Sequence, residues 1–217
     1  MWERKGLAIA AMQSLLYGRP DLTVFGSESK RAETLAYLGR MIDLAAGLGA
    51  GVLVFGSPKK SPYRRAARRS NGCDRALVFF APRRPGRVGG GGDRARSQSD
   101  GLRRRFLTRA EEAKRFVVDL NHPGVCLHLC SGCMALAGDD AVAAIRDGAP
   151  WLRHFHISAP FLEPLRHADL PHEALATALR GVGYRGWASI EMKTADPFSM
   201  KDVEEALAIA TRYYAGG

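Results

Sequence analysis

The chain lacks the features that would place it in a membrane or outside the cell. No apolar run reaches the roughly 18 residues that a membrane span needs. Residues 1–6 have neither the apolar core nor the small-residue cleavage site of a signal peptide. The four cysteines, of which Cys126, Cys130 and Cys133 are clustered, do not form a secreted disulfide framework. We therefore expect a cytoplasmic protein without a membrane partner, and 217 residues predict about one domain.

Acidic residues are scarce in one segment only. Residues 59–105 hold 15 Lys and Arg against 3 Asp and Glu, whereas the rest of the chain holds 17 against 19. Charge alone would give weak, salt-sensitive binding to nucleic acid, and the segment has no regularly interleaved aromatic residues for base stacking. We expect a solvated loop, and a nucleic-acid-binding protein that uses residues 60–105 is kept as an alternative.

Outside that segment, strand and helix patterns alternate. Short apolar runs predict strands at residues 7–12, 52–55, 125–130, 152–157 and 187–191. Helical spacing predicts helices at residues 31–48, 110–120, 139–146, 172–180 and 202–214. This order indicates parallel βαβ units, which a barrel or a doubly wound sheet would satisfy. No phosphate-binding glycine motif follows a strand, which disfavours the dinucleotide-binding type.

Several predicted strands end in polar or reactive residues. These are Cys130, His156 followed by Ser158, and Glu191. A lone strand histidine is usually a satisfied core residue, but a buried carboxylate without a partner is costly. Because ligands bind at the carboxyl ends of strands in α/β folds, three such ends in consecutive units predict a shared site.

Five stretches, residues 11–18, 54–59, 127–134, 154–160 and 189–192, resemble the xylose isomerase-like sugar phosphate isomerase/epimerase family. The resemblance covers residues of about 7–58 and 106–214. It implies a (β/α)8 TIM barrel of carbohydrate metabolism, with a divalent metal at its mouth held by a Glu, an Asp, a His and a Glu. The metal would polarise the sugar oxygens while carboxylates move protons. The endonuclease IV type of metal barrel is a related alternative, but it needs more His and carboxylate ligands.

The family's site residues carry over incompletely. Glu191 matches the last metal ligand and catalytic base, and His156 matches the histidine ligand. His154 and Ser158 would contact the sugar or sugar phosphate. Cys130 stands where the family has its Asp ligand, and a thiolate favours Zn over Mg or Mn. Cys130 and Cys133 also allow half a zinc site or a redox pair, or simply small apolar residues in a barrel strand.

Residues 60–105 replace a helix and a strand that the family would place there, the strand ending in Glu-Pro-Asn. Ordinary codons for residues 93–105, read one base later, would encode Ile-Glu-Pro-Asp-Pro-Asn-Pro-Thr-Val-Tyr-Gly-Ala, which resembles the missing strand. We hypothesise that this basic Gly/Arg-rich segment is translated out of frame. The nucleotide sequence decides the matter, since codons that do not yield the second reading would end the idea.

The predicted architecture is therefore one incomplete domain over residues 1–217, with an irregular insert at 60–105. The first strand resembles the family's third, which implies an N-terminal truncation and about five recognisable βα units. The expected function is a sugar isomerase or epimerase that is impaired in this copy, so its status as an active enzyme stays open. A homo-oligomer also stays open.

Overall fold

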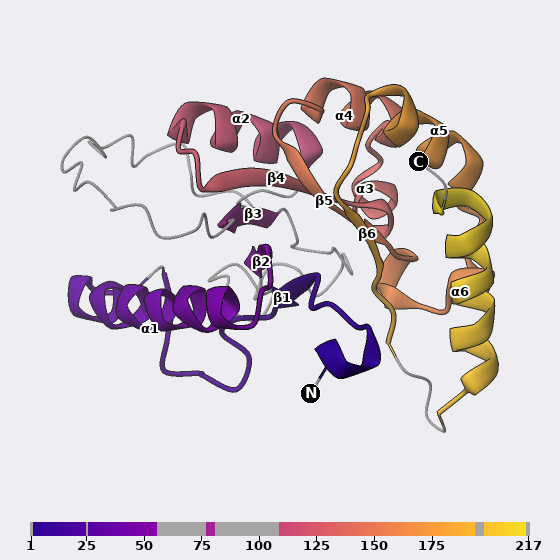
Figure 1. The fold of residues 1–217 in the computed structure, drawn as a ribbon. Helices are drawn as coiled ribbons and strands as arrows, with labels where there is room; N and C mark the ends of the chain where they lie inside the picture. The colour runs from indigo at the N-terminus through magenta and orange to yellow at the C-terminus, as the bar shows by residue number, and fades with distance from the viewer. Residues whose placement is uncertain (1, 25, 56–76, 81–108, 194–197, 216–217) are drawn as a thin grey trace.

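The fold was analysed in a computed structural model, which describes residues 2–24, 26–55, 77–80, 109–193 and 198–215. Six strands form one sheet in the order β1-β2-β3-β4-β5-β6 (Figure 1). The strands are β1 (Ala11–Gln13), β2 (Val52–Phe55), β3 (Leu77–Phe80), β4 (Val125–Cys130), β5 (Leu152–Ile157) and β6 (Trp187–Ile190). Each of the five strands expected from the apolar runs is present, although β1 is shorter and begins later than expected.

The strand directions depart from an all-parallel barrel at one place. β1 pairs with β2, β4 with β5, and β5 with β6 in parallel. β3 is antiparallel to both β2 and β4, so the other five strands share one direction. Leu77–Phe80, which forms β3, lies inside the segment 60–105. The rest of residues 60–105 lies outside the described residues.

Helices follow most of the parallel strands. They are α1 (Glu28–Gly47), α2 (Ala110–Leu120), α3 (Ser131–Ala137), α4 (Ala141–Gly148), α5 (His172–Gly181) and α6 (Met200–Tyr214), with short 3-10 turns at Glu3–Lys5, Pro160–Leu162 and Leu165–His167. The Ser27 side chain caps α1 by accepting the Lys30 N–H, and Gly49 adopts a positive φ after its end. Asp140 caps α4 and Ser199 caps α6 in the same way. Among the described helices, none is both long and apolar enough to cross a bilayer.

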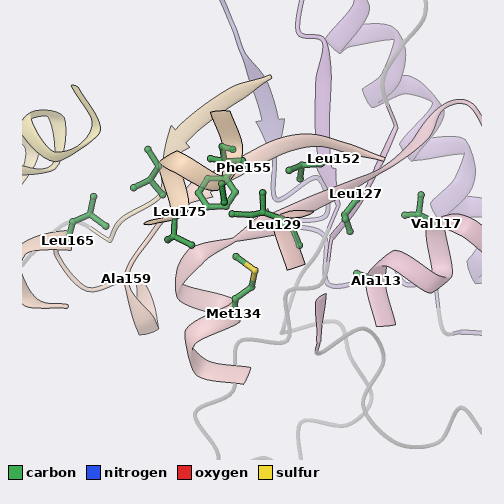
Figure 2. Close-up of a cluster of buried hydrophobic side chains, with 14 of the residues drawn as sticks. Ala113, Val117, Leu127, Leu129, Met134, Leu152, Phe155, Ala159, Leu165 and Leu175 are labelled. Carbon is green, nitrogen blue, oxygen red and sulfur yellow. The ribbon is translucent and has the colours of Figure 1, made fainter. Parts of the chain in front are cut away.

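The main core lies between β4, β5 and the helices that cover them. Leu127 and Leu129 on β4 and Phe155 and Ile157 on β5 point into it and meet residues of α2, α3, α4 and α5 (Figure 2). A second apolar cluster around Leu53 joins α1 to β2. Because side chains alternate along a strand, the intervening residues of β4 and β5 must face the other side of the sheet, which we call the inner face.

One close contact ties α3 to the segment after β5. A methyl group at Gly132 would meet the backbone carbonyl of Ala159. We predict that Gly132→Ala lowers the free energy of unfolding by about 1–3 kcal/mol, since the backbones must move apart. At Gly39 in α1 there is open space, so Gly39→Ala should stabilise by about 0.5–1 kcal/mol. Urea unfolding of both variants checks this, and equal effects would contradict it.

His172 links α5 to α6 and makes stability depend on pH. Its ring is buried, and Nδ1 lies 3.0 Å from the Tyr214 hydroxyl. Burial lowers the pKa of His172, so the unfolded chain takes up the proton first. This contribution to stability is full above the ordinary histidine pKa of about 6.5 and is lost as the pH falls through that value.

We predict that His172→Gln reduces the loss of stability between pH 7 and pH 5. Tyr214→Phe is the matched control, because it removes the hydrogen bond but keeps a buried, titrating His172. Denaturant unfolding at both pH values measures the slope for each protein. A His172→Gln variant with the wild-type slope would refute the assignment.

Candidate active site

A cluster of three histidines occupies the inner face of the sheet. His128 comes from β4, and His154 and His156 come from β5. Their exposed fractions are 2%, 0% and 2%. The ring centroids of His128 and His156 lie 4.2 Å apart, and those of His154 and His156 lie 5.0 Å apart. Side-chain alternation therefore separates an apolar face toward the helices from a histidine-lined face within the same two strands.

A β-bulge sets this alignment. Leu127 pairs with Leu152, but the next residue, His128, pairs with His154, so Arg153 has no counterpart on β4. A bulge inserts one residue into one strand and re-aims the side chains that follow it. Past the bulge, Cys130 pairs with His156. The bulge thus brings the reactive ends of β4 and β5 side by side.

His154 is held as a neutral imidazole. Burial lowers its pKa to about 4, and the neighbouring His156 also disfavours its charged form. A neutral imidazole carries one donor and one acceptor nitrogen, so it can exchange hydrogen bonds with hydroxyl groups without adding charge. His154, which was expected to contact substrate, sits deeper along β5 than His156.

His156 and Glu191 come together at the carboxyl ends of neighbouring strands. His156 Nδ1 lies 3.1 Å from Glu191 Oε2, with the two side chains 3% and 14% exposed. The Glu191 N–H donates to the carbonyl of Ile157 at 3.0 Å, which extends the pairing of β5 with the residue after β6. Main-chain pairing therefore fixes the carboxylate beside the imidazole.

Cys130 is directed toward a different neighbour. Its Sγ lies 3.0 Å from Ser158 Oγ and accepts the Cys133 N–H at 3.3 Å. Ser158 Oγ also accepts the Gly132 N–H at 3.2 Å. Cys130 and Cys133 are free thiols in this arrangement. The structure thus brings Cys130 and Ser158 together, and it pairs His156 with Glu191.

Ser131 completes this network, and the sequence did not single it out. Its Oγ donates to the carbonyl of Ser158 at 2.8 Å, lies 3.1 Å from the carbonyl of His156, and accepts the Ser158 N–H at 2.9 Å. The sequence also missed His128, although its position two residues before Cys130 on an apolar strand predicts a shared face. We call Cys130, Ser131, Gly132, Cys133 and Ser158 the thiol–serine network.

The described residues supply only part of the divalent metal site that the resemblance implies. His156 and Glu191 provide two donors that could share one cation. Cys130, at the position of the family's aspartate, is engaged in the thiol–serine network. Within the described residues, no three His, Cys, Asp or Glu side chains form a group that could hold a metal ion. The described residues therefore do not fit a complete divalent metal site.

Comparisons with known proteins agree with this architecture. The sequence model of the family described as xylose isomerase-like TIM barrel matches residues 100–213. Among curated proteins, none matches the chain. The 3-keto-D-glucoside 4-epimerase YcjR from E. coli is similar in structure, with a TM-score of 0.65 and 18% identity over 96% of this chain and 81% of that one.

Two further solved structures are similar. The IolI protein with a bound zinc atom has a TM-score of 0.60 and 13% identity, and the match covers 97% of this chain and 79% of that one. A D-psicose 3-epimerase studied with D-fructose has a TM-score of 0.51 and 18% identity over 95% and 65%. At sequence identities of 13% and 18%, the structural similarity establishes the fold alone.

The fold is thus an α/β sheet of the TIM-barrel type, and the six described strands form an incomplete barrel. The family match spans more than half of the chain, so the chain belongs to the xylose isomerase-like TIM barrel family. The resemblance drawn from the five stretches is confirmed.

The thiol–serine network gives a testable stability prediction. Ser131→Ala would leave the buried Ser158 N–H without its acceptor, which should cost about 1–3 kcal/mol of the free energy of unfolding. Thr211→Ala, which removes a hydroxyl at an exposed position of α6, should change it by less than about 0.5 kcal/mol. Chemical denaturation of the two variants measures both values. A Ser131→Ala protein as stable as the control would show that the network contributes nothing.

Proposed function

We propose that this chain is a sugar isomerase or epimerase whose proton-transfer group is Glu191, and that its activity is impaired. The observation that carries the proposal is the 3.1 Å approach of His156 Nδ1 to Glu191 Oε2 at the carboxyl ends of β5 and β6. In α/β barrels this is the edge at which substrates bind. The similar solved structures named as epimerases support the substrate class, a sugar or sugar phosphate.

The chemistry needs a base beside an acidic C–H. Isomerisation and epimerisation both remove a proton from a carbon next to a carbonyl and return it at another position or face. Glu191 is a carboxylate that remains partly accessible, so it can accept and return that proton. His156 holds the carboxylate in place, and neutral His154 can hydrogen-bond a sugar hydroxyl. The substrate roles of His154 and Ser158 are part of this proposal.

Impairment is proposed because the charge at Cys130 differs from the family pattern. An aspartate would bring a fixed negative charge to the mouth. Cys130 is instead a buried thiol that contacts the Ser158 hydroxyl and accepts the Cys133 N–H. The Mn, Mg or Zn ion implied by the resemblance stays a prediction, with His156 and Glu191 as its proposed ligands. Cys130 would join them only if it gave up its contacts with Ser158 and Cys133. A cytoplasmic location is also proposed, because three buried cysteines remain free thiols, which is typical of a reducing compartment.

Deuterium exchange tests the proposal directly. The full chain, incubated in D2O with a panel of aldoses, ketoses and their phosphates, should introduce deuterium slowly beside the carbonyl carbon, as read by mass spectrometry. Glu191→Gln should reduce the rate by at least about 100-fold, since it removes the base. Glu163→Gln, at an exposed residue after the 3-10 turn, is the control and should leave the rate unchanged.

Parallel reactions with added Mn, Mg or Zn, or after treatment with a chelator, test the metal. Acceleration that depends on both His156 and Glu191 would support a bound cation. Absence of exchange with every sugar, or exchange that survives Glu191→Gln, would overturn the proposed function.

A further inference from the structure

Two hollows lie at the edge of the sheet opposite the candidate active site. The first is a cavity of about 370 Å3 between α5, α6 and the start of β6, and Trp187 and Arg180 contribute to its lining. The second, of about 340 Å3, lies between the start of β5 and the turn from α5 to β6, with Arg153 in its lining. Cavities of this size are in the range that holds small molecules. Residues 184–186 line both, so the two hollows are adjacent.

These hollows are separate from the mouth that holds His156 and Glu191. Trp187 is the first residue of β6, whereas Glu191 follows its last residue. Four residues of extended strand span roughly 13 Å. The second hollow lies at the amino ends of β5 and β6, and the first reaches Ile157 on the helix-covered face of β5. A molecule bound there would lie on the opposite face of the sheet from the inner-face histidines.

The lining is positively charged without compensation. Arg153 lines the second hollow, Arg180 lines the first and Arg185 lines both. Neither lining contains an Asp or Glu. Among the described residues, none of these three arginines takes part in an ion pair, although several other arginines of the chain do. Such an arrangement favours an anion, because each guanidinium presents up to five donors in a fixed fork.

Two of the arginines are held in place by bonds that leave donors available. Arg180 donates through Nη1 to the carbonyl of Tyr213 at 2.8 Å and through Nη2 to Thr177 Oγ1 at 3.1 Å. Arg153 donates through Nη1 alone, to the carbonyls of Pro150 and Leu152. The bulge described above is the reason that Arg153 leaves the strand ladder at this edge. Guanidinium groups positioned in advance lose less conformational entropy when they bind.

The turn between the two hollows is also rigid. Gly183 adopts a positive φ, and the Tyr184 hydroxyl donates to the carbonyl of Trp187 at 2.8 Å. A side chain at Gly186 would meet Tyr184 and the carbonyl of Arg153. Apolar residues of α5 and α6, among them Leu179, line the first hollow and can contact a ring-shaped group. The site thus pairs an apolar wall with an arginine, Arg185, that lines both hollows.

We propose that these paired hollows bind a small organic phosphate, with the phosphate at Arg185 and its ring in the first hollow against Leu179. A charged phosphate satisfies several guanidinium donors in the bidentate manner that Arg favours. A sugar phosphate and a mononucleotide share this chemistry of a ring with a phosphate. The inference is independent of the proposed catalytic function, because it uses none of the residues at the mouth.

Binding titrations test the proposal and distinguish a sugar phosphate from a mononucleotide. The full chain is titrated by calorimetry with inorganic phosphate, glucose 6-phosphate, AMP, glucose and adenosine. Saturable binding is expected for the phosphorylated ring compounds. Glucose and adenosine, which lack the phosphate, should not bind. A preference for AMP or for glucose 6-phosphate identifies the source of the ring. Equal binding of a compound with and without its phosphate, or no saturable binding at all, would overturn the proposal.

Matched arginine variants locate the site. Arg185→Gln should weaken binding of the preferred phosphate at least about tenfold, the equivalent of one lost charge-assisted hydrogen bond. Arg146→Gln, which removes the same charge from an exposed position of α4 outside both linings, should leave affinity unchanged. Equal weakening by the two variants would show a diffuse charge effect and refute the site.

A third variant tests the ring contact. Thr211→Leu, which places a larger side chain at an exposed position of the first hollow's lining, should weaken binding of glucose 6-phosphate or AMP while binding of inorganic phosphate stays as in the wild type. Circular dichroism and thermal unfolding establish that each variant is folded before it is titrated. If Thr211→Leu leaves the organic phosphates unaffected, the placement of the ring is wrong.

Discussion

The register between β4 and β5 is the constraint on which the site depends. Because side chains alternate along a strand, one register decides which residues enter the core and which face inward. The bulge at Arg153 sets Leu129 and Phe155 toward the helices while His128 and His156 meet on the inner face. A slip of one residue would bury histidines in the apolar core, which would be costly. The apolar core and the histidine cluster are therefore two results of one pairing.

The thiol–serine network joins the end of β4 to the residues that follow β5. Cys130 is buried and contacts Ser158 Oγ and the Cys133 N–H. Ser131 joins the end of β4 to the residues after β5 by hydrogen bonds to main-chain groups, and Gly132 lets the two backbones approach. A thiol is satisfied by such contacts, whereas a carboxylate there would need a cation or additional donors. The network therefore holds the mouth together without a counter-ion.

The sequence could predict the features that follow from local pattern. The apolar runs located the five parallel strands, and strand-end chemistry predicted that His156 and Glu191 converge, which the 3.1 Å distance shows. It could not predict the bulge, because an extra residue in β5 leaves no periodic mark. It missed α3, whose seven residues are too few for a helical period. The antiparallel direction of β3 could not be predicted either, because it depends on long-range pairing and a local apolar run does not indicate strand direction.

The position of β3 also decides how the two parts of the sheet depend on each other. Neighbouring parallel strands need a crossover connection of a dozen or more residues, whereas an antiparallel strand can pair with its neighbours without one. β3 fills the gap between β2 and β4 in this way and keeps the sheet continuous. Yet the apolar cluster of α1 and β2 is separate from that of β4, β5 and α2 to α6. Since His156 and Glu191 both belong to the second part, their geometry rests on its core, and the pairing of β3 adds continuity without supplying the site.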